Sequence, residues 1–294
     1  MKQALTMSNI NSMDGKTVLI TGASRGIGRE TALALAKTGA HVVMVCRESK
    51  KAHESYEAIS ATAGKDHIDL MIADLSSMDS IRRLASEIKK KYTSLHVLIN
   101  NAGTYSSKLR ITKEGHELTF ATNHLAPFLL TSLLLDTMLA SAPARVINVS
   151  STMHRGAKVD FDNLNGEKRY SGYNAYSVSK LFNILFTYEL ARRLDKSKVT
   201  VNCLHPGSVN TGITRGGNLF IRIGAKLIIP TMISPYKGAQ TSIYLATSSE
   251  VESVTGRYFV DCKPVQSSPA SYDEALAKRV WELSGRLTRL SSVS

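Results

Sequence analysis

The chain has 294 residues, of which 43% are hydrophobic and 21% charged, which is typical of one large globular domain. Its net charge of +13 is compatible with nucleic-acid binding, but the cations are spread along the chain and no aromatic residues alternate with them. An anionic surface or an anionic cofactor explains the basic composition as well. Three widely spaced cysteines, Cys46, Cys203 and Cys262, predict neither a disulfide framework nor a metal site, and favour a reducing compartment such as the cytoplasm.

Residues 1–14 read as a loose polar leader without an apolar run, so we expect neither a signal peptide nor a membrane span there. A βαβ unit follows, with strands predicted at 17–20 and 41–45 and a helix at 27–38. Gly22, Gly26 and Gly28 lie between the first strand and the helix in the order GxxxGxG. Such glycines let the backbone approach a pyrophosphate, whose charge the helix N-terminus binds. Ordinary turn chemistry is the alternative.

Strand and helix patterns alternate along the rest of the chain. Further strands are predicted at 67–72, 96–99, 144–149, 199–204 and 256–260, and helices near 114–138 and 173–194. This alternation predicts an α/β fold, in which helices cover both faces of a doubly wound parallel sheet. We assign residues 15–264 to this single Rossmann-type domain and 265–294 to a C-terminal extension with a helix.

Tyr176 and Lys180 lie four residues apart near the start of a predicted helix, so both side chains project from one face. An ammonium beside a phenol lowers the phenol pKa, which makes the phenol a usable acid or base at a carbonyl or alcohol. Ser151 follows a predicted strand and is therefore expected at the carboxyl edge of the sheet, where doubly wound folds bind ligands. Taken alone, the pair also fits a solvated helix face, and the serine fits a helix cap.

Together these stretches resemble the short-chain dehydrogenase/reductase family over nearly the whole chain, which implies a seven-stranded sheet. The matching motifs are Thr21-Gly22-Ala23-Ser24-Arg25-Gly26-Ile27-Gly28, Asp74-Leu75, Asn100-Asn101-Ala102-Gly103, Asn123, Asn148-Val149-Ser150-Ser151, Tyr176 with Lys180, and Pro206-Gly207. Within the family, the 25-residue separation of Ser151 and Tyr176 and the segment Gly256-Arg257-Tyr258-Phe259-Val260-Asp261-Cys262 most resemble the retinol dehydrogenase branch.

The resemblance implies direct hydride transfer between a nicotinamide and a carbonyl carbon. It implies that Tyr176 exchanges the proton, Lys180 favours the phenolate and binds the nicotinamide ribose, and Ser151 polarises the carbonyl. Asn123 is expected to hold a water that connects Lys180 to solvent. The residues expected to contact the cofactor are Gly22, Ser24, Arg25, Gly26, Ile27, Gly28, Arg47, Asp74, Leu75, Asn101, Ala102, Gly103, Tyr176, Lys180, Pro206, Gly207, Val209 and Thr211. Nearby His124, His154 and His205 are expected to line the pocket rather than bind a metal.

The end of the second predicted strand indicates which nicotinamide cofactor is bound. NAD-selective sites place a carboxylate there, whereas an arginine accommodates the 2'-phosphate of NADP. Here neutral Cys46 is followed by Arg47, and family members direct the residue equivalent to Arg25 toward the same region. Because two guanidiniums bind a phosphate through charge-assisted hydrogen bonds, NADP(H) is favoured. Glu48 leaves NAD open, since a carboxylate two positions away would select it.

An apolar stretch at residues 219–233 is interrupted by Arg222 and Lys226 and is too short to span a bilayer. The resemblance implies a substrate lid here, at about 212–234, over an apolar pocket. Contact of this amphipathic segment with a lipid surface is the alternative.

We therefore expect a soluble oxidoreductase that uses NADP(H) and acts on the carbonyl or alcohol of an apolar compound, either retinoid-like or another lipid or aromatic aldehyde or ketone. A steroid or tetrapyrrole substrate is an alternative, as is a catalytically silent cofactor-binding regulator or scaffold. Nucleic acid is not expected as a partner. In the family, the helices predicted at 114–138 and 173–194 commonly pair across a two-fold axis, so a homodimer or homotetramer is expected, and a monomer is the alternative because chains of the retinol branch are sometimes monomeric.

Overall fold

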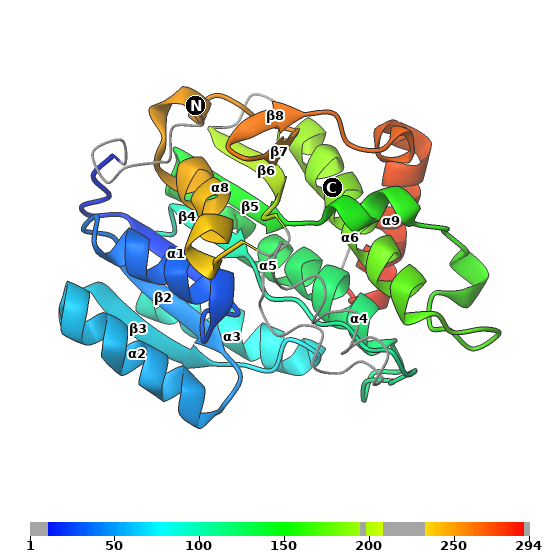
Figure 1. Cartoon of the computed structure of the whole chain (residues 1–294), viewed down its shortest axis with the longest axis horizontal. Helices are drawn as coiled ribbons and strands as arrows, with labels where there is room; N and C mark the ends of the chain where they lie inside the picture. The colour runs from blue at the N-terminus through cyan, green and yellow to red at the C-terminus, as the bar shows by residue number, and fades with distance from the viewer. Residues whose placement is uncertain (1–10, 195–197, 208–232, 291–294) are drawn as a thin grey trace.

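A computed structural model describes residues 11–194, 198–207 and 233–290. Its centre is one eight-stranded sheet in the order β3-β2-β1-β4-β5-β6-β7-β8 (Figure 1). The strands are β1 (Thr17–Thr21), β2 (His41–Cys46), β3 (Ile68–Ile72), β4 (Val97–Asn100), β5 (Ala144–Val149), β6 (Val199–His205), β7 (Arg257–Val260) and β8 (Lys263–Val265). The first seven run parallel, and β8 pairs antiparallel with β7. The predicted doubly wound fold is confirmed.

All seven expected strands are present, and the eighth corrects the expected count. β8 has three residues, one of them Pro264, which has no N–H to donate and is tolerated at a sheet edge. Asp261 and Cys262 join β7 to β8 with φ values of 49° and 61°. Left-handed conformations at both central residues are typical of a two-residue hairpin turn, but Asp-Cys is not a common sequence for it. Periodicity therefore could not reveal this strand.

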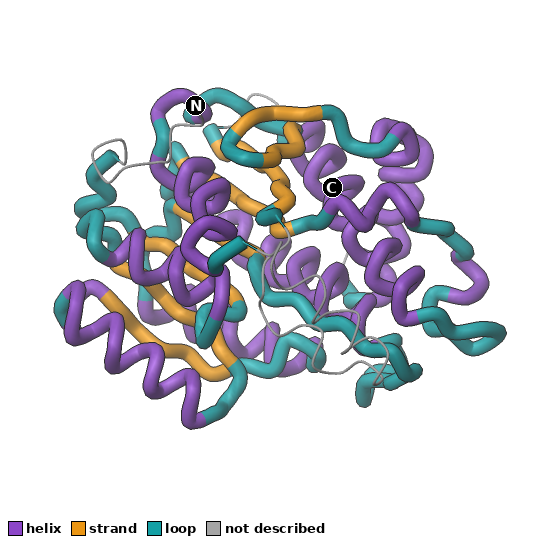
Figure 2. The backbone as a smooth tube through the Cα atoms, viewed as in Figure 1, coloured by secondary structure: helices purple, strands orange, loops and turns teal. Residues whose placement is uncertain are grey.

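Alternate residues of each central strand pack against opposite layers of helices. Leu19 of β1 belongs to one hydrophobic core, whereas Val18 and Ile20 belong to the other. Helices cover both sides of the strands (Figure 2). One layer contains α1 (Gly26–Ala36), α2 (Lys50–Ala63) and α8 (Pro235–Thr247); the other contains α3 (Met78–Lys91), α5 (Ala126–Ala140), α6 (Gly172–Arg193) and α9 (Glu274–Leu287).

The helix expected at 114–138 is interrupted. It consists of a short α4 (Leu118–Phe120), a π-helical turn (Ala121–Leu125) and α5. A π turn holds one extra residue and is frequent at functional sites. Within the described residues, the stretch Leu118–Ala140 is long and apolar enough to cross a membrane, but 72% of its apolar window is buried inside the protein. Such burial is typical of a core helix.

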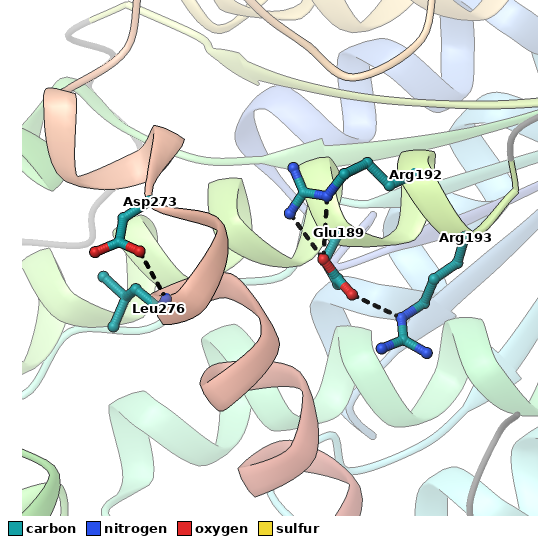
Figure 3. Close-up of polar contacts among 5 residues, drawn as sticks. All are labelled: Glu189, Arg192, Arg193, Asp273 and Leu276. Carbon is teal, nitrogen blue, oxygen red and sulfur yellow. Dashed lines mark hydrogen bonds and ion pairs between the residues drawn. The ribbon is translucent and has the colours of Figure 1, made fainter.

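The C-terminal helix α9 packs against α5 and α6. Trp281 lies 5.1 Å from the ring of Phe128 and 5.9 Å from that of Phe186, between ring centroids. The guanidinium of Arg193 lies 4.4 Å from the centre of the Trp281 ring. Figure 3 shows Glu189 of α6 between Arg192 and Arg193. One carboxylate oxygen lies 2.7 Å from Nη2 of Arg192, and the other lies 2.9 Å from Nε of Arg193. Aromatic packing and a cation–π contact therefore attach the end of the chain to the centre of the fold.

Candidate active site

The glycine-rich loop lies at the carboxyl end of β1, between β1 and α1. Gly22 has a φ of +70°, and a Cβ there would lie 2.8 Å from the Cα of Ala102. At Gly28 a Cβ would lie 2.5 Å from the carbonyl oxygen of Gly22. Because β2 and β4 flank β1 and the strand order reverses there, this loop stands at the topological switch point where such folds bind nucleotides. The close backbone approach fits a pyrophosphate site.

The N-terminus of α1 is free to bind an anion. Its N-cap residue, Arg25, is extended and makes no side-chain capping hydrogen bond, so no Arg25 side-chain group caps the first N–H groups of the helix. Gly26 opens the helix, and Ile27 is buried beneath it. The residues expected to hold the cofactor phosphates therefore form one continuous turn.

Asn101 and Ala102 follow β4 and are tied to the end of β1. Both of their N–H groups donate to Oγ1 of Thr21, each at 3.0 Å. The Asn101 side chain donates to the carbonyl oxygens of Thr21, at 2.8 Å, and Gly22, at 3.2 Å. Asn101 thus shapes the glycine loop, so its side-chain amide is already used within the protein.

Asp74 and Leu75 lie just beyond β3. One oxygen of Asp74 accepts hydrogen bonds from the N–H and the hydroxyl of Ser76, at 2.9 and 2.8 Å, while Leu75 is buried. The carboxylate is exposed at the same sheet edge as the glycine loop. This position is compatible with the expected contact to an adenine.

At the end of β2, Cys46 is buried, and burial raises the pKa of its thiol to about 11, so the group is neutral. Arg25 and Arg47 are both exposed. The carboxylate of Glu48 lies 2.8 Å from Nε2 of His53 on α2. The end of β2 therefore carries a neutral thiol, the exposed Arg47 and a carboxylate that contacts His53, while Arg25 is exposed in the glycine loop.

Ser151, Tyr176 and Lys180 lie together at the carboxyl end of β5. The Ser151 side chain is close enough to Tyr176 to favour the ionised phenol and so lowers its pKa. Nζ of Lys180 donates to the Val149 carbonyl at 2.8 Å and lies 5.5 Å from the centre of the Tyr176 ring. The N–H of Met153 donates to Oγ of Ser151 at 3.2 Å. The Ser151 hydrogen thus remains available for Tyr176 or for a substrate oxygen.

Burial perturbs the two titratable groups of this trio. It raises the pKa of Tyr176 to about 12, against the lowering effect of the Ser151 hydrogen bond. It also lowers the pKa of Lys180 to about 8. Loss of hydration therefore favours the neutral form of both groups, and the expected effect of the lysine charge on the phenol stays a prediction.

Asn123 lies in the π turn and is completely buried. Its Oδ1 accepts from the N–H of Thr104 at 2.7 Å, and its Nδ2 donates to the Thr104 carbonyl at 3.0 Å and to Oγ of Ser179 at 3.1 Å. A Cβ on Gly103 would lie 3.6 Å from both Oδ1 of Asn123 and Nζ of Lys180. The absence of a side chain at Gly103 therefore leaves space next to both groups.

Pro206 and Gly207 follow β6. Gly207 has a φ of +86°, and a Cβ there would lie 2.5 Å from Cδ1 of Ile233, so a larger residue would be strained and would require the Ile233 side chain to shift. Val209, Thr211 and nearly all of the expected lid lie outside the described residues.

The three histidines near the motifs have different environments. His124 does not line the pocket: it is fully buried, stacks on Phe120 at 5.7 Å and bonds to Ser284 of α9 at 2.8 Å. His205 accepts from the N–H of Thr152 at 3.3 Å, and His154 contacts the backbone of Ser151. Sequence proximity to the motifs could not separate a core histidine from one beside the site.

The comparisons with known proteins agree with this geometry. A family model described as short chain dehydrogenase matches residues 16–219, and the chain belongs to that family. It is 43% identical over 287 residues to retinol dehydrogenase 14 of Mus musculus, covering 92% of this chain and 85% of that protein. It is therefore a retinol dehydrogenase-like member, an NAD(P)-dependent oxidoreductase that acts on CH–OH or C=O groups.

Two solved structures show the same architecture. A putative uncharacterized protein from Mycobacterium paratuberculosis has a TM-score of 0.79 and 30% identity, covering 98% of both chains. An NADP active-site complex of RhlG from Pseudomonas aeruginosa has a TM-score of 0.68 and 28% identity, covering 84% of this chain and 95% of that one.

Proposed function

We propose that the protein transfers a hydride between NADP(H) and the carbonyl or alcohol of an apolar substrate, either retinoid-like or another lipid or aromatic aldehyde or ketone. The observation that carries the proposal is the convergence of Ser151, Tyr176 and Lys180 at the sheet edge that also holds the glycine loop. The name of retinol dehydrogenase 14 supports the substrate class.

A bound nicotinamide supplies or receives the hydride. Ser151 donates a hydrogen bond to the substrate oxygen, because the N–H of Met153 occupies only one of its acceptor positions and leaves its hydrogen free. Tyr176 gives its proton to that oxygen during reduction and takes it back during alcohol oxidation. Lys180 sits beside the phenol, and its pKa of about 8 lets it hold or release a proton near neutral pH. Asn123 borders the space next to Lys180 through which this proton is exchanged with water.

The preference for NADP(H) rests on the end of β2. Arg47 is exposed there, Arg25 is exposed in the glycine loop, and Cys46 is neutral at the position where NAD-selective proteins place a carboxylate. The contact of Glu48 with His53 supports the same choice, since this carboxylate is already engaged. NADP in the structurally similar RhlG complex adds support.

The test combines a substrate panel with one variant. Retinoid, steroid, aliphatic and aromatic aldehydes are assayed with NADPH, and Tyr176→Phe is assayed on the best substrate. Loss of the phenolic proton should lower kcat at least about 100-fold, as is usual for a lost acid–base group. NADPH binding should be retained, because the ring remains in place. Near-normal turnover by the variant would exclude Tyr176 as the proton donor, and a wild-type chain inactive on every carbonyl would refute the proposed reaction.

A further inference from the structure

The turn that carries Ser151 is attached to a distant part of the chain. Residues Thr152–Gly156 form a short 3-10 helix after Ser151, and His154 at its centre is 1% exposed. Nδ1 of His154 lies 2.6 Å from the carbonyl oxygen of Ser151. On the other side of the ring, the N–H of Ser268 lies 2.9 Å from Nε2, across a sequence separation of 114 residues.

These two contacts determine the tautomer of His154. A backbone N–H can only donate, so Nε2 must be the unprotonated, accepting nitrogen. A carbonyl oxygen can only accept, so Nδ1 must carry the hydrogen and donate it to Ser151. Both ring nitrogens are then satisfied in the neutral form. Protonation of the ring would bring two N–H groups together at Nε2. Burial also lowers the pKa of His154, which favours the neutral ring.

Other contacts hold the same two segments together. Arg155 donates to the carbonyl oxygen of Gln266 at 2.6 Å. The Tyr258 ring packs edge-on against His154, with 5.1 Å between ring centroids. The Tyr188 hydroxyl bonds to that of Ser267 at 2.8 Å, next to the segment that contacts His154. His154 is therefore held in place from two sides and is not free to rotate away from Ser151.

We propose that His154 is a positioning residue that holds the Ser151 backbone in its reactive orientation, with the main chain of Ser268 as its support. The inference rests on the proposed function. Its consequence is that the C-terminal extension takes part in arranging the active site. The plainer alternative is a buried histidine that contributes only to stability.

Two substitutions at His154 separate its two hydrogen bonds. The carboxamide in His154→Asn reaches the Nδ1 position, where its nitrogen can donate to Ser151, but it leaves Ser268 without an acceptor. In His154→Gln the carboxamide reaches the Nε2 position, where its oxygen accepts from Ser268, but the donor to Ser151 is lost. We expect His154→Gln to lower kcat by roughly 10- to 100-fold, as misplacement of a reacting group does, and His154→Asn to lower it clearly less. NADPH affinity, measured by nucleotide fluorescence, should be unchanged in both.

A second pair tests the support from the C-terminal extension. Ser268 has a φ of −73°, which proline adopts, so Ser268→Pro removes the N–H while Ser268→Ala keeps it. Proline should lower kcat relative to alanine. Equal kcat in these two variants would overturn the role of the extension. Equal kcat losses in the two His154 variants, or a change in thermal midpoint alone, would overturn the positioning role.

One readout does not depend on activity. In a sample with ¹⁵N-labelled histidine, NMR should find hydrogen on Nδ1 of His154 and none on Nε2, and the opposite tautomer would overturn the proposal. If the wild-type chain turns over no carbonyl substrate, the proposed function fails, whereas the tautomer still decides whether His154 holds Ser151 in the way inferred.

Discussion

At the scale of single residues, burial and hydrogen bonding decide what Tyr176 and Lys180 can do. Loss of hydration favours the neutral form of both groups, with pKa values near 12 for the phenol and near 8 for the amine. Alcohol oxidation needs the phenolate and carbonyl reduction needs the phenol. We therefore expect the charge on Lys180 to influence the pH range in which each direction proceeds.

Replacing the lysine should shift this range. Below the Lys180 pKa of about 8 the amine is charged and favours the phenolate. In Lys180→Met that charge is lost, so the phenol pKa rises further and the oxidation profile moves to higher pH. Oxidation at pH 7 should fall at least about tenfold, which corresponds to one pKa unit. The measurement is kcat against pH at saturating cofactor. A profile of unchanged shape would show that Lys180 does not act on the phenol.

Cofactor selection is also decided by single residues. Removing both guanidiniums in Arg25→Ala, Arg47→Ala should weaken NADPH binding at least about tenfold, since each charge-assisted hydrogen bond contributes about 1.5 to 3 kcal/mol. NADH binding should barely change, because it has no 2'-phosphate. Fluorescence titration with both nucleotides checks this. Equal losses for the two cofactors, or a parent protein that prefers NADH, would contradict the assignment.

At the scale of elements, α9 is held to α6 by a mixture of apolar and charged contacts. Trp281 packs among the rings of Phe128 and Phe186, and Arg193 lies over its face. Arg193 is itself paired with the buried Glu189 (Figure 3). At the other side of the same layer, His124 of the π turn bonds to Ser284 of α9. The C-terminal helix thus completes a core rather than lying on the surface.

This packing gives Trp281→Ala a large expected effect. Truncating a buried tryptophan removes its apolar contacts and leaves a cavity, which costs about 3 to 5 kcal/mol of unfolding free energy. Chemical denaturation of the variant measures the loss. Exposed Glu282 on the same helix provides the control, because Glu282→Ala should change stability by less than about 0.5 kcal/mol. A similar small change in both variants would mean that α9 does not contribute to the cooperative unit.

At the scale of the whole molecule, α9 changes the expectation about assembly. The helices predicted at 114–138 and 173–194 were expected to pair with a second copy. In the structure, every residue of α6 from position 177 to 191 is buried within one chain, in part beneath α9. A two-fold contact through that helix would require α9 to move. Soluble monomers rarely expose large contiguous apolar surfaces, so an apolar face uncovered by loss of α9 would favour association.

We therefore expect the full chain not to dimerise through α6, and to sediment as a monomer unless a different surface associates. Deleting residues 274–294 should expose the apolar face of α6 and produce dimers or larger species. Analytical ultracentrifugation of the two chains tests this. A full-length dimer that cross-links between two α6 helices would disprove it.

Local patterns in the sequence were sufficient for much of this protein. Alternation of strands and helices, the positions of Gly22 and Gly28, and the spacing of Tyr176 and Lys180 each lie within a window of a few residues. Backbone geometry acts over that range, so a sequence can be interpreted there without coordinates. The fold class, the position of the glycine loop and the helix that carries Tyr176 all followed from such windows.

Tertiary structure decided the features that depend on distant partners. The short strand β8 forms only because it pairs with the edge of β7. The position of Asn123 depends on the extra residue in the π-helical turn, which hydrophobic periodicity does not reveal. The neutral preference of Tyr176 and Lys180 arises from burial, which the whole fold creates. The bond between His154 and Ser268 joins residues 114 positions apart. Burial and long-range packing exist only once the chain is folded, and for that physical reason the sequence alone could determine the candidate residues but not their protonation or their support.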